Sequence, residues 1–172
     1  MDINSLGGQL LDRSFQWVQA KQDNDSKIRM LYLECLRNLG LLDCLNLESP
    51  KASKSNDPDF IAVAKLIDVG IIELVFAEGK RNHLLFKSLS KTVSVNLDNT
   101  EQEDDKDPKT LLEALLYLYK KSFVLSKLIA VEKKGNALKR INFRVRLHNF
   151  RAALLCVVKK LETFDEVKIL SQ

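Results

Sequence analysis

The sequence predicts an all-α protein, a single-domain antiparallel bundle of five or six helices with one acidic mobile loop. Apolar residues recur at intervals of three and four over most of the 172 residues, which is the spacing of one helix face. Helix start and stop signals divide the chain into segments of ordinary helical length. The alternation typical of a strand occurs at residues 92–98, where no obvious partner strand accompanies it.

The composition is that of a globular chain, with 45% hydrophobic and 29% charged residues. The length suits one domain, residues 1–172, with loops expected at 47–57 and 92–107. The first twenty residues do not show the pattern of a signal peptide. The three cysteines indicate a reducing compartment, because an odd number without metal-site spacing resembles small core residues. We therefore expect a cytoplasmic protein.

The longest apolar stretch, Phe60 to Ala77, is predicted to be a buried helix. Lys65, Asp68 and Glu73 interrupt it, and each would be costly in the middle of a bilayer. The sequence therefore predicts no membrane partner.

The N-terminal region is predicted to hold two helical segments. The first ends near Gln22 and carries an apolar stripe at Ile3, Leu6, Leu10, Ser14 and Trp17. Capping side chains follow at 23–26, and the helical pattern resumes from Ile28 to Leu39. Gly40 is a candidate left-handed stop. The pattern leaves open whether the two segments form one long helix.

Two further helices are predicted to begin at Asp-Pro pairs, Asp57-Pro58 and Asp107-Pro108, because aspartate can cap a helix and proline is tolerated in its first turn. The segment from Asp59 to about Ala77 is apolar nearly all round, which favours a central helix with neighbours on several sides. Gly79 can end it. A short helix is expected from 84 to about 90.

The third quarter of the chain combines an acidic loop with a long helix. Residues 101–107 contain five acids, and their mutual repulsion predicts a solvated, mobile segment. The helix after Pro108 has a broad apolar stripe at Leu112, Leu115, Leu116, Tyr119, Phe123 and Ile129. Lys133-Lys134-Gly135 is expected to close it.

The last long helix is predicted from about Asn136 to Leu161, and Thr163 and Glu166 have the spacing of a capping box for a short tail helix. Its buried face is expected at Phe143, Leu147, Phe150, Leu154 and Leu161.

Beside that face, Arg140, Arg144 and Arg151 share one side of the predicted last helix. The segment from 133 to 161 has nine basic residues and no acid, so it contributes +9, and the rest of the chain contributes −5 to the total of +4. Such local charge fits contact with phosphates. The alternative is that the arginines lie in a seam and pair with acids of other helices, with Glu34, Glu73, Glu78 or the acidic loop as candidates.

Arg144 and His148 are the candidate catalytic residues, because they lie one helical turn apart and both could meet a phosphate. In this pair and in its bundle character the chain resembles the HEPN family of small all-α ribonucleases, in which an arginine, four to six residues and a histidine lie near a dimer interface. That resemblance implies metal-independent RNA cleavage by a homodimer. The spacing departs from the family pattern, since three residues separate Arg144 from His148 and seven separate Arg140 from His148.

No metal or cofactor is predicted. Cys35, Cys44 and Cys156 lack C-x-x-C spacing and nearby histidines, and Glu78-Gly79-Lys80 lacks the remainder of a phosphate-binding loop. Glu34 and Asn38, one turn apart on a leucine-rich helix, are expected to make a buried polar contact across helices.

The function predicted from the sequence is a non-enzymatic helical interaction module that contacts a larger macromolecule through its basic C-terminal helix, with Arg140, Arg144, Arg151 and His148 as the binding residues. A protein is the expected partner. The alternative is a small protein that binds RNA or DNA, or cleaves RNA in the manner of the HEPN family with Arg144 and His148, as a homodimer.

Overall fold

A computed structural model describes residues 3–45, 47, 58–91, 110–131 and 143–168. For residues 3–18 it describes the path of the helix backbone but not the side chains. The elements in chain order are α1 (Ile3–Asp43), α2 (Pro58–Leu66), α3 (Gly70–Ala77), the 3-10 helix η1 (Gly79–Asn82), α4 (His83–Leu89), α5 (Leu111–Val131), α7 (Phe143–Leu161) and α8 (Asp165–Lys168). The described residues contain no strand, which confirms the all-α prediction.

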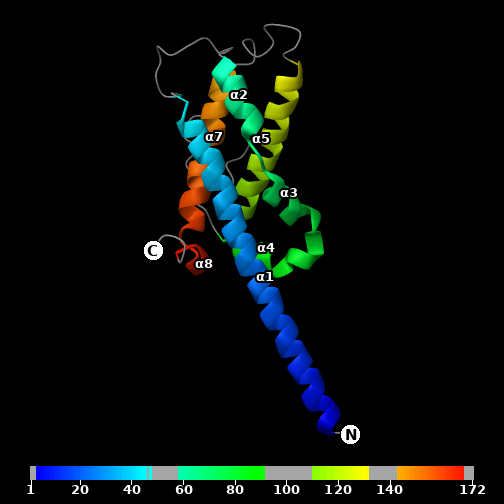
Figure 1. Cartoon of the computed structure of the whole chain (residues 1–172). Helices are drawn as coiled ribbons and strands as arrows, with labels where there is room; N and C mark the ends of the chain where they lie inside the picture. The colour runs from blue at the N-terminus through cyan, green and yellow to red at the C-terminus, as the bar shows by residue number, and fades with distance from the viewer. Residues whose placement is uncertain (1–2, 46, 48–57, 92–109, 132–142, 169–172) are drawn as a thin grey trace.

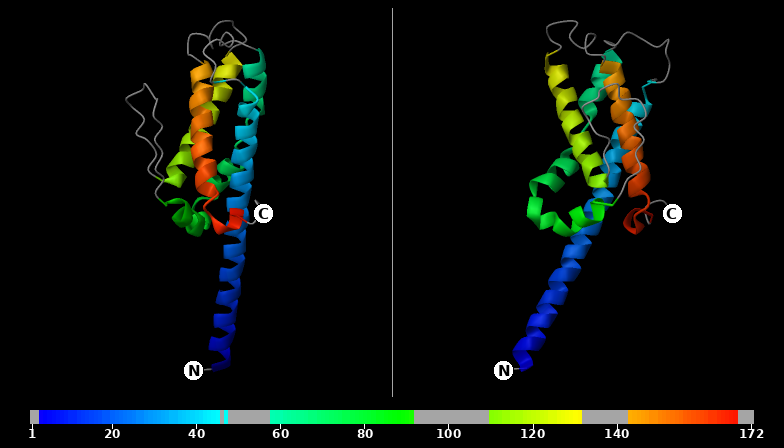
Figure 2. Two further views of the ribbon diagram at one scale, coloured as in Figure 1. Left: turned by 90° about the vertical axis from the view of Figure 1, so that its left-hand side faces the viewer. Right: turned by 180° about the vertical axis from the view of Figure 1, so that it is seen from behind.

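The helices form a bundle in which α7 packs against both α1 and α5 (Figure 1). The helices α1 and α7 are antiparallel, because Arg29 near the middle of α1 contacts Glu166 beyond α7, whereas Asp43 at the end of α1 contacts Arg151. The short helices α3 and α4 curve round the lower end of α5, and α8 lies beside α1 (Figures 1 and 2).

The two N-terminal segments are one helix. Helix α1 runs through the capping residues at 23–26 without a break and spans 41 residues. Gly40 is an exposed helical position and does not end α1, so that prediction was wrong. The left-handed glycine is Gly79, with φ of 50°, and it follows the end of α3 as expected.

The buried face of α7 agrees with the sequence pattern. Phe143, Leu147, Phe150, Leu154 and Leu161 are all at most 1% exposed. These side chains meet the buried faces of α1 and α5 in one core, to which α1 contributes Ile28, Leu31, Cys35, Leu39 and Leu42. Helix α7 therefore holds the bundle together.

The predicted face of α5 was wrong in part. Phe123 is 56% exposed, and the buried line instead follows Leu111, Ala114, Leu115, Leu118 and Leu125. Helix α5 is apolar on more than one side, so its own spacing does not decide which side faces α7. Its start differs too, because Thr110 and Glu113 form a capping box that places Leu111 first.

Among the remaining predictions, two are confirmed, one is wrong, and others concern residues outside the described ranges. Helix α2 begins at Pro58 and α8 forms after α7, as predicted. The Thr163 hydroxyl, however, donates to the Lys160 carbonyl and does not cap α8. The loop from 48 to 57, the strand-like residues 92–98, the acidic segment 101–107 and the start of the last helix at 136 lie outside the described residues.

Candidate functional site

The arginines of α7 lie in a seam between α7 and the end of α1. The Arg151 Nε donates to Asp43 Oδ1 at 2.6 Å, and the two side chains are 25% and 47% exposed. Two turns N-terminal to Arg151 on α7, Arg144 is half-buried and its Nη2 donates to the Leu47 carbonyl oxygen at 3.0 Å. Both guanidinium groups therefore hold the C-terminal end of α1 and the residues after it against α7.

These contacts agree with the seam interpretation, and the described partners, Asp43 and a main-chain carbonyl, were not among the acids named from the sequence. Glu34 and Glu78 have other partners, described below, and Glu73 is exposed. The acidic segment and Arg140 lie outside the described residues. His148 is half-buried, one turn beyond Arg144. A binding or catalytic role for these residues stays a prediction.

A second polar cluster joins α1 to the junction between α2 and α3. The Glu34 carboxylate is buried, at 7% exposure, and accepts the backbone N–H groups of Ile71 at 2.7 Å and Ile72 at 3.0 Å. These are N–H groups of the first turn of α3, which have no acceptor within that helix. Glu34 thus caps α3 from another helix, since Val69 at the N-cap position of α3 makes no side-chain cap hydrogen bond.

Asn38, one turn further along α1 and fully buried, completes the same junction. Its amide accepts the Asp68 N–H and donates to the Asp68 carbonyl oxygen. The Asp68 side chain accepts the Gly70 N–H and pairs with Arg37. The predicted single helix from 59 to 77 is therefore wrong: residues 67–69 leave the helix because α1 provides hydrogen bonds for the interrupted backbone.

The carboxyl groups of this junction shift in opposite directions. Burial raises the pKa of Glu34, although the hydrogen bonds that it accepts from two backbone N–H groups act to lower the pKa. The hydrogen bond from Arg37, helped by the Gly70 N–H, lowers the pKa of Asp68. The environment of Glu34 therefore disfavours the charge, and that of Asp68 favours it.

A pH dependence follows for the variant Glu34→Gln. The pKa of Glu34 is higher in the folded than in the unfolded chain. Its protonated form therefore stabilises the wild-type protein below the unfolded pKa, and this stabilisation is lost as the pH rises through the folded pKa. Glutamine does not titrate, so the stability of Glu34→Gln relative to wild type should increase from pH 5 to pH 7. Urea unfolding at pH 5 and at pH 7 measures this difference in stability, and the exposed Glu73→Gln is the control. A difference that is constant or decreases with pH contradicts the assignment.

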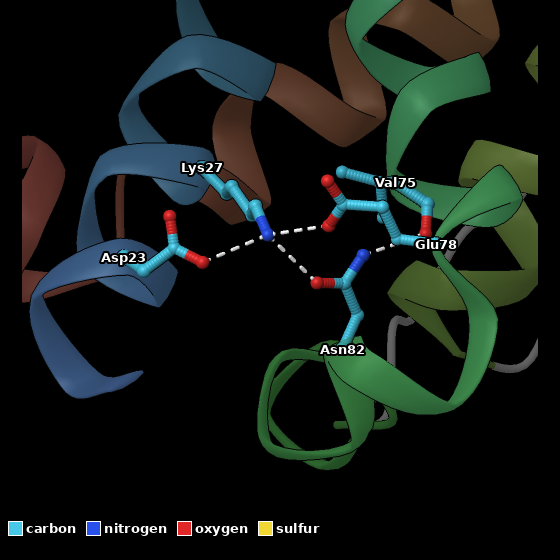
Figure 3. Close-up of polar contacts among 5 residues, drawn as sticks. All are labelled: Asp23, Lys27, Val75, Glu78 and Asn82. Atoms are coloured by element: carbon cyan, nitrogen blue, oxygen red, sulfur yellow. Dashed lines mark hydrogen bonds and ion pairs between the residues drawn. The ribbon is translucent and has the colours of Figure 1, made fainter. Parts of the chain in front are cut away.

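A third polar cluster lies where α1 leaves the bundle (Figure 3). The Lys27 ammonium donates to Glu78 at 2.6 Å, to Asp23 at 2.9 Å and to the Asn82 side-chain oxygen at 2.9 Å. The buried Asn82 amide then donates to the Val75 carbonyl oxygen at 2.8 Å. All three donors of the ammonium have partners, so this cluster fastens α1 to η1 and to the end of α3.

The charges of this cluster are consistent with a structural role. Burial acts to lower the pKa of Lys27, but Glu78 and Asp23 outweigh it and leave the pKa raised. The hydrogen bond from Lys27 lowers the pKa of Glu78. The sequence contained no local signal for this cluster, because Glu78 and Asn82 lie 51 and 55 residues from Lys27.

No family model matches the chain, and comparison with curated proteins and with solved structures finds no similar one. Among the described residues, no helix has both the length and the apolar content needed to cross a membrane. In the same part of the chain, His, Cys, Asp and Glu side chains do not gather in a group of three or more that could hold a metal ion.

The N-terminal part of α1 extends beyond the bundle. Both rotated views show it as a single helix with no other described helix beside it (Figure 2). We call residues 3–22 the N-terminal arm, because the first described contacts of α1 with other elements are those of Lys27, which is paired with Asp23 on the same helix. At 1.5 Å per residue the arm is about 30 Å long. Its last residues, Gln19, Lys21 and Gln22, are exposed.

Proposed function

We propose that this chain is a non-enzymatic interaction module that contacts a macromolecular partner through its N-terminal arm. The observation that carries the proposal is the projection of an apolar-striped helix away from the bundle (Figure 1). This surface has more support than α7, because the arginines of α7 with described contacts, Arg144 and Arg151, are engaged with the end of α1.

The arm is a poor helix on its own. Gly7 and Gly8 each cost about 1 kcal/mol relative to alanine in a helix interior. Isolated helices of this length are marginal in water, and helices in proteins gain most of their stability by packing an apolar face. Seven large apolar residues occur in the arm: Ile3, Leu6, Leu10, Leu11, Phe15, Trp17 and Val18. An arm of this composition is expected to be stabilised by a partner.

The bundle supplies a rigid base for the arm. Lys27 fastens the emerging helix to η1, and Glu34 and Asn38 fasten it to the junction of α2 and α3. N-terminal to Asp23 the helix continues with no other described helix beside it (Figure 2). A continuous helix with one end fixed presents its free end in a defined direction, which suits an adaptor.

Site-specific photo-cross-linking in cells that express the full chain tests this proposal. A photoreactive residue at Leu10, on the apolar stripe, should give a discrete adduct. The control is Gln19, nine residues or two and a half turns away and so on the opposite side of the helix. An adduct at Leu10 that is absent at Gln19, and that Leu6→Glu abolishes, is the expected result. No adduct at Leu10, or equal adducts at both positions, contradicts the proposal.

A further inference from the structure

The apolar stripe of the arm continues the core face of α1. Ile28 follows Leu10 by 18 residues, and Cys35 follows Trp17 by 18 residues. Eighteen residues are five full helical turns, so each pair occupies the same position around the helix axis. Ile28 and Cys35 are buried in the bundle core. Because α1 is unbroken from Ile3 to Asp43, the side of α1 that is buried in the bundle core is the side that carries the stripe in the arm.

The stripe has a symmetric spacing. Its positions, Ile3, Leu6, Leu10, Ser14 and Trp17, are separated by three, four, four and three residues. The order of these intervals is the same in both directions, with Leu10 at the centre. In an antiparallel two-fold pair residue i lies opposite residue j and residue j opposite residue i, so this spacing places every position of the stripe opposite another position of the stripe.

The charge of the arm also suits an identical partner. The charged residues of the arm are Asp12, Arg13 and Lys21, and their charges sum to +1. With so small a net charge, two arms repel each other only weakly. A strongly acidic or basic arm would instead call for a partner of the opposite charge.

We infer that the arm pairs with the arm of a second copy of this chain, antiparallel, with the two-fold axis near Leu10. This inference rests on the proposed function and names its partner. The pairing brings Leu10 against its symmetry mate, Leu6 opposite Ser14, and Ile3 opposite Trp17. Each position of the stripe then lies opposite a position of the same stripe in the other copy. At Leu6 and Ser14 a large residue lies opposite a small one, which lets the two helices approach closely.

The length of the arm fits this arrangement. With the axis at Leu10, the first helical residue of the partner lies opposite Trp17. Six residues, or about 9 Å of helix, then separate Ile3 of the partner from Asp23, the residue that follows the arm. The two bundles lie at opposite ends of the paired arms and do not meet. The dimer is an elongated particle with a bundle at each end.

Sedimentation of the purified full chain over a range of concentrations tests the pairing. We expect a reversible monomer–dimer equilibrium. Leu10→Glu should weaken the dimer at least about a hundredfold, because two apolar contacts are lost and two like charges meet at the axis. The matched control is Gln19→Glu, which adds the same charge on the opposite side and should leave the equilibrium unchanged. A chain that is monomeric at all concentrations, or equal effects of both variants, overturns the inference.

Thiol cross-linking determines the direction of the pairing. Cys44→Ser and Cys156→Ser remove the two cysteines that are not buried, and Cys35 can remain because burial raises the pKa of its thiol and shields it. In this background Leu10→Cys should cross-link to itself. Ile3→Cys should cross-link to Trp17→Cys only when the two proteins are mixed. Self-cross-linking of Ile3→Cys alone indicates a parallel pair and overturns the antiparallel arrangement.

The two proposals fail in distinguishable ways. If the photoreactive residue at Leu10 forms an adduct with a different protein, and the purified chain stays monomeric, the self-pairing is wrong and the interaction module stands. If no adduct of any kind forms and the chain is monomeric, both are wrong. An adduct at twice the mass of the chain, lost in Leu6→Glu, supports both.

Discussion

Replacing Phe150 by alanine is expected to lower the free energy of unfolding by about 4 kcal/mol, as is typical of a buried phenylalanine. Phe150 is 1% exposed and lies midway along α7, the helix that joins α1 to α5 in the core. Truncation removes the transfer free energy of the ring and leaves a cavity that close-packed neighbours cannot fill. Urea unfolding followed by circular dichroism measures the loss.

Phe123→Ala is the matched control for this experiment. It deletes the same ring from α5, where the side chain is 56% exposed and its ring lies beneath the Lys127 ammonium. We expect a loss of less than about 1 kcal/mol, since a cation–π contact at an exposed site contributes about 0.5–1 kcal/mol. Equal losses from the two substitutions would show that α7 is not the central helix of the core.

Replacing Glu34 by alanine is expected to cost about 3 kcal/mol at pH 7. The substitution leaves the N–H groups of Ile71 and Ile72 without their acceptor, and an unsatisfied buried donor costs about 1–3 kcal/mol. Glu34→Gln keeps one acceptor oxygen and removes the charge that burial disfavours, so its cost should be smaller than that of Glu34→Ala. The measurement is again the free energy of unfolding in urea.

The control for Glu34 lies on the helix that it caps. Glu73 is in the first turn of α3 and is exposed, so Glu73→Ala removes a carboxylate from the same helix end without breaking a described cap. We expect a loss within the 0.3–1 kcal/mol of a helix-dipole interaction. In a double-mutant cycle, Glu34→Ala and Asn38→Ala should be non-additive, because both act on residues 68–72. Additive losses would mean that the two side chains support the junction independently.

The helical class and the buried side of α7 were predictable from the sequence. Phe143 and Phe150 share one helical phase with leucines on both sides, so the helix has a continuous apolar face that packing must bury. Helix α5 shows where this reasoning fails. It is apolar on several sides, so the exposure of Phe123 depends on which neighbours are present.

The candidate site was predictable only in outline. The phase of Arg144 and Arg151 beside the core line indicated a seam, and the structure places both there. Their partners, Asp43 and the Leu47 carbonyl, lie about a hundred residues earlier in the chain, and no local pattern indicates such a pairing. The stripe from Ile3 to Trp17 was visible in the sequence, whereas its separation from the bundle was not.

The sequence by itself determined that this chain is helical, where Pro58 and Gly79 punctuate it, and which face of α7 is apolar, because propensity and periodicity depend on residues within a few turns of one another. Only the tertiary structure decided that Ile3 to Asp43 form one helix, half of it outside the bundle, and that the apolar run from 59 to 77 breaks at Asp68. The break depends on Glu34 and Asn38, at least 30 residues earlier. Hydrogen bonds between distant segments form only when the core brings those segments together.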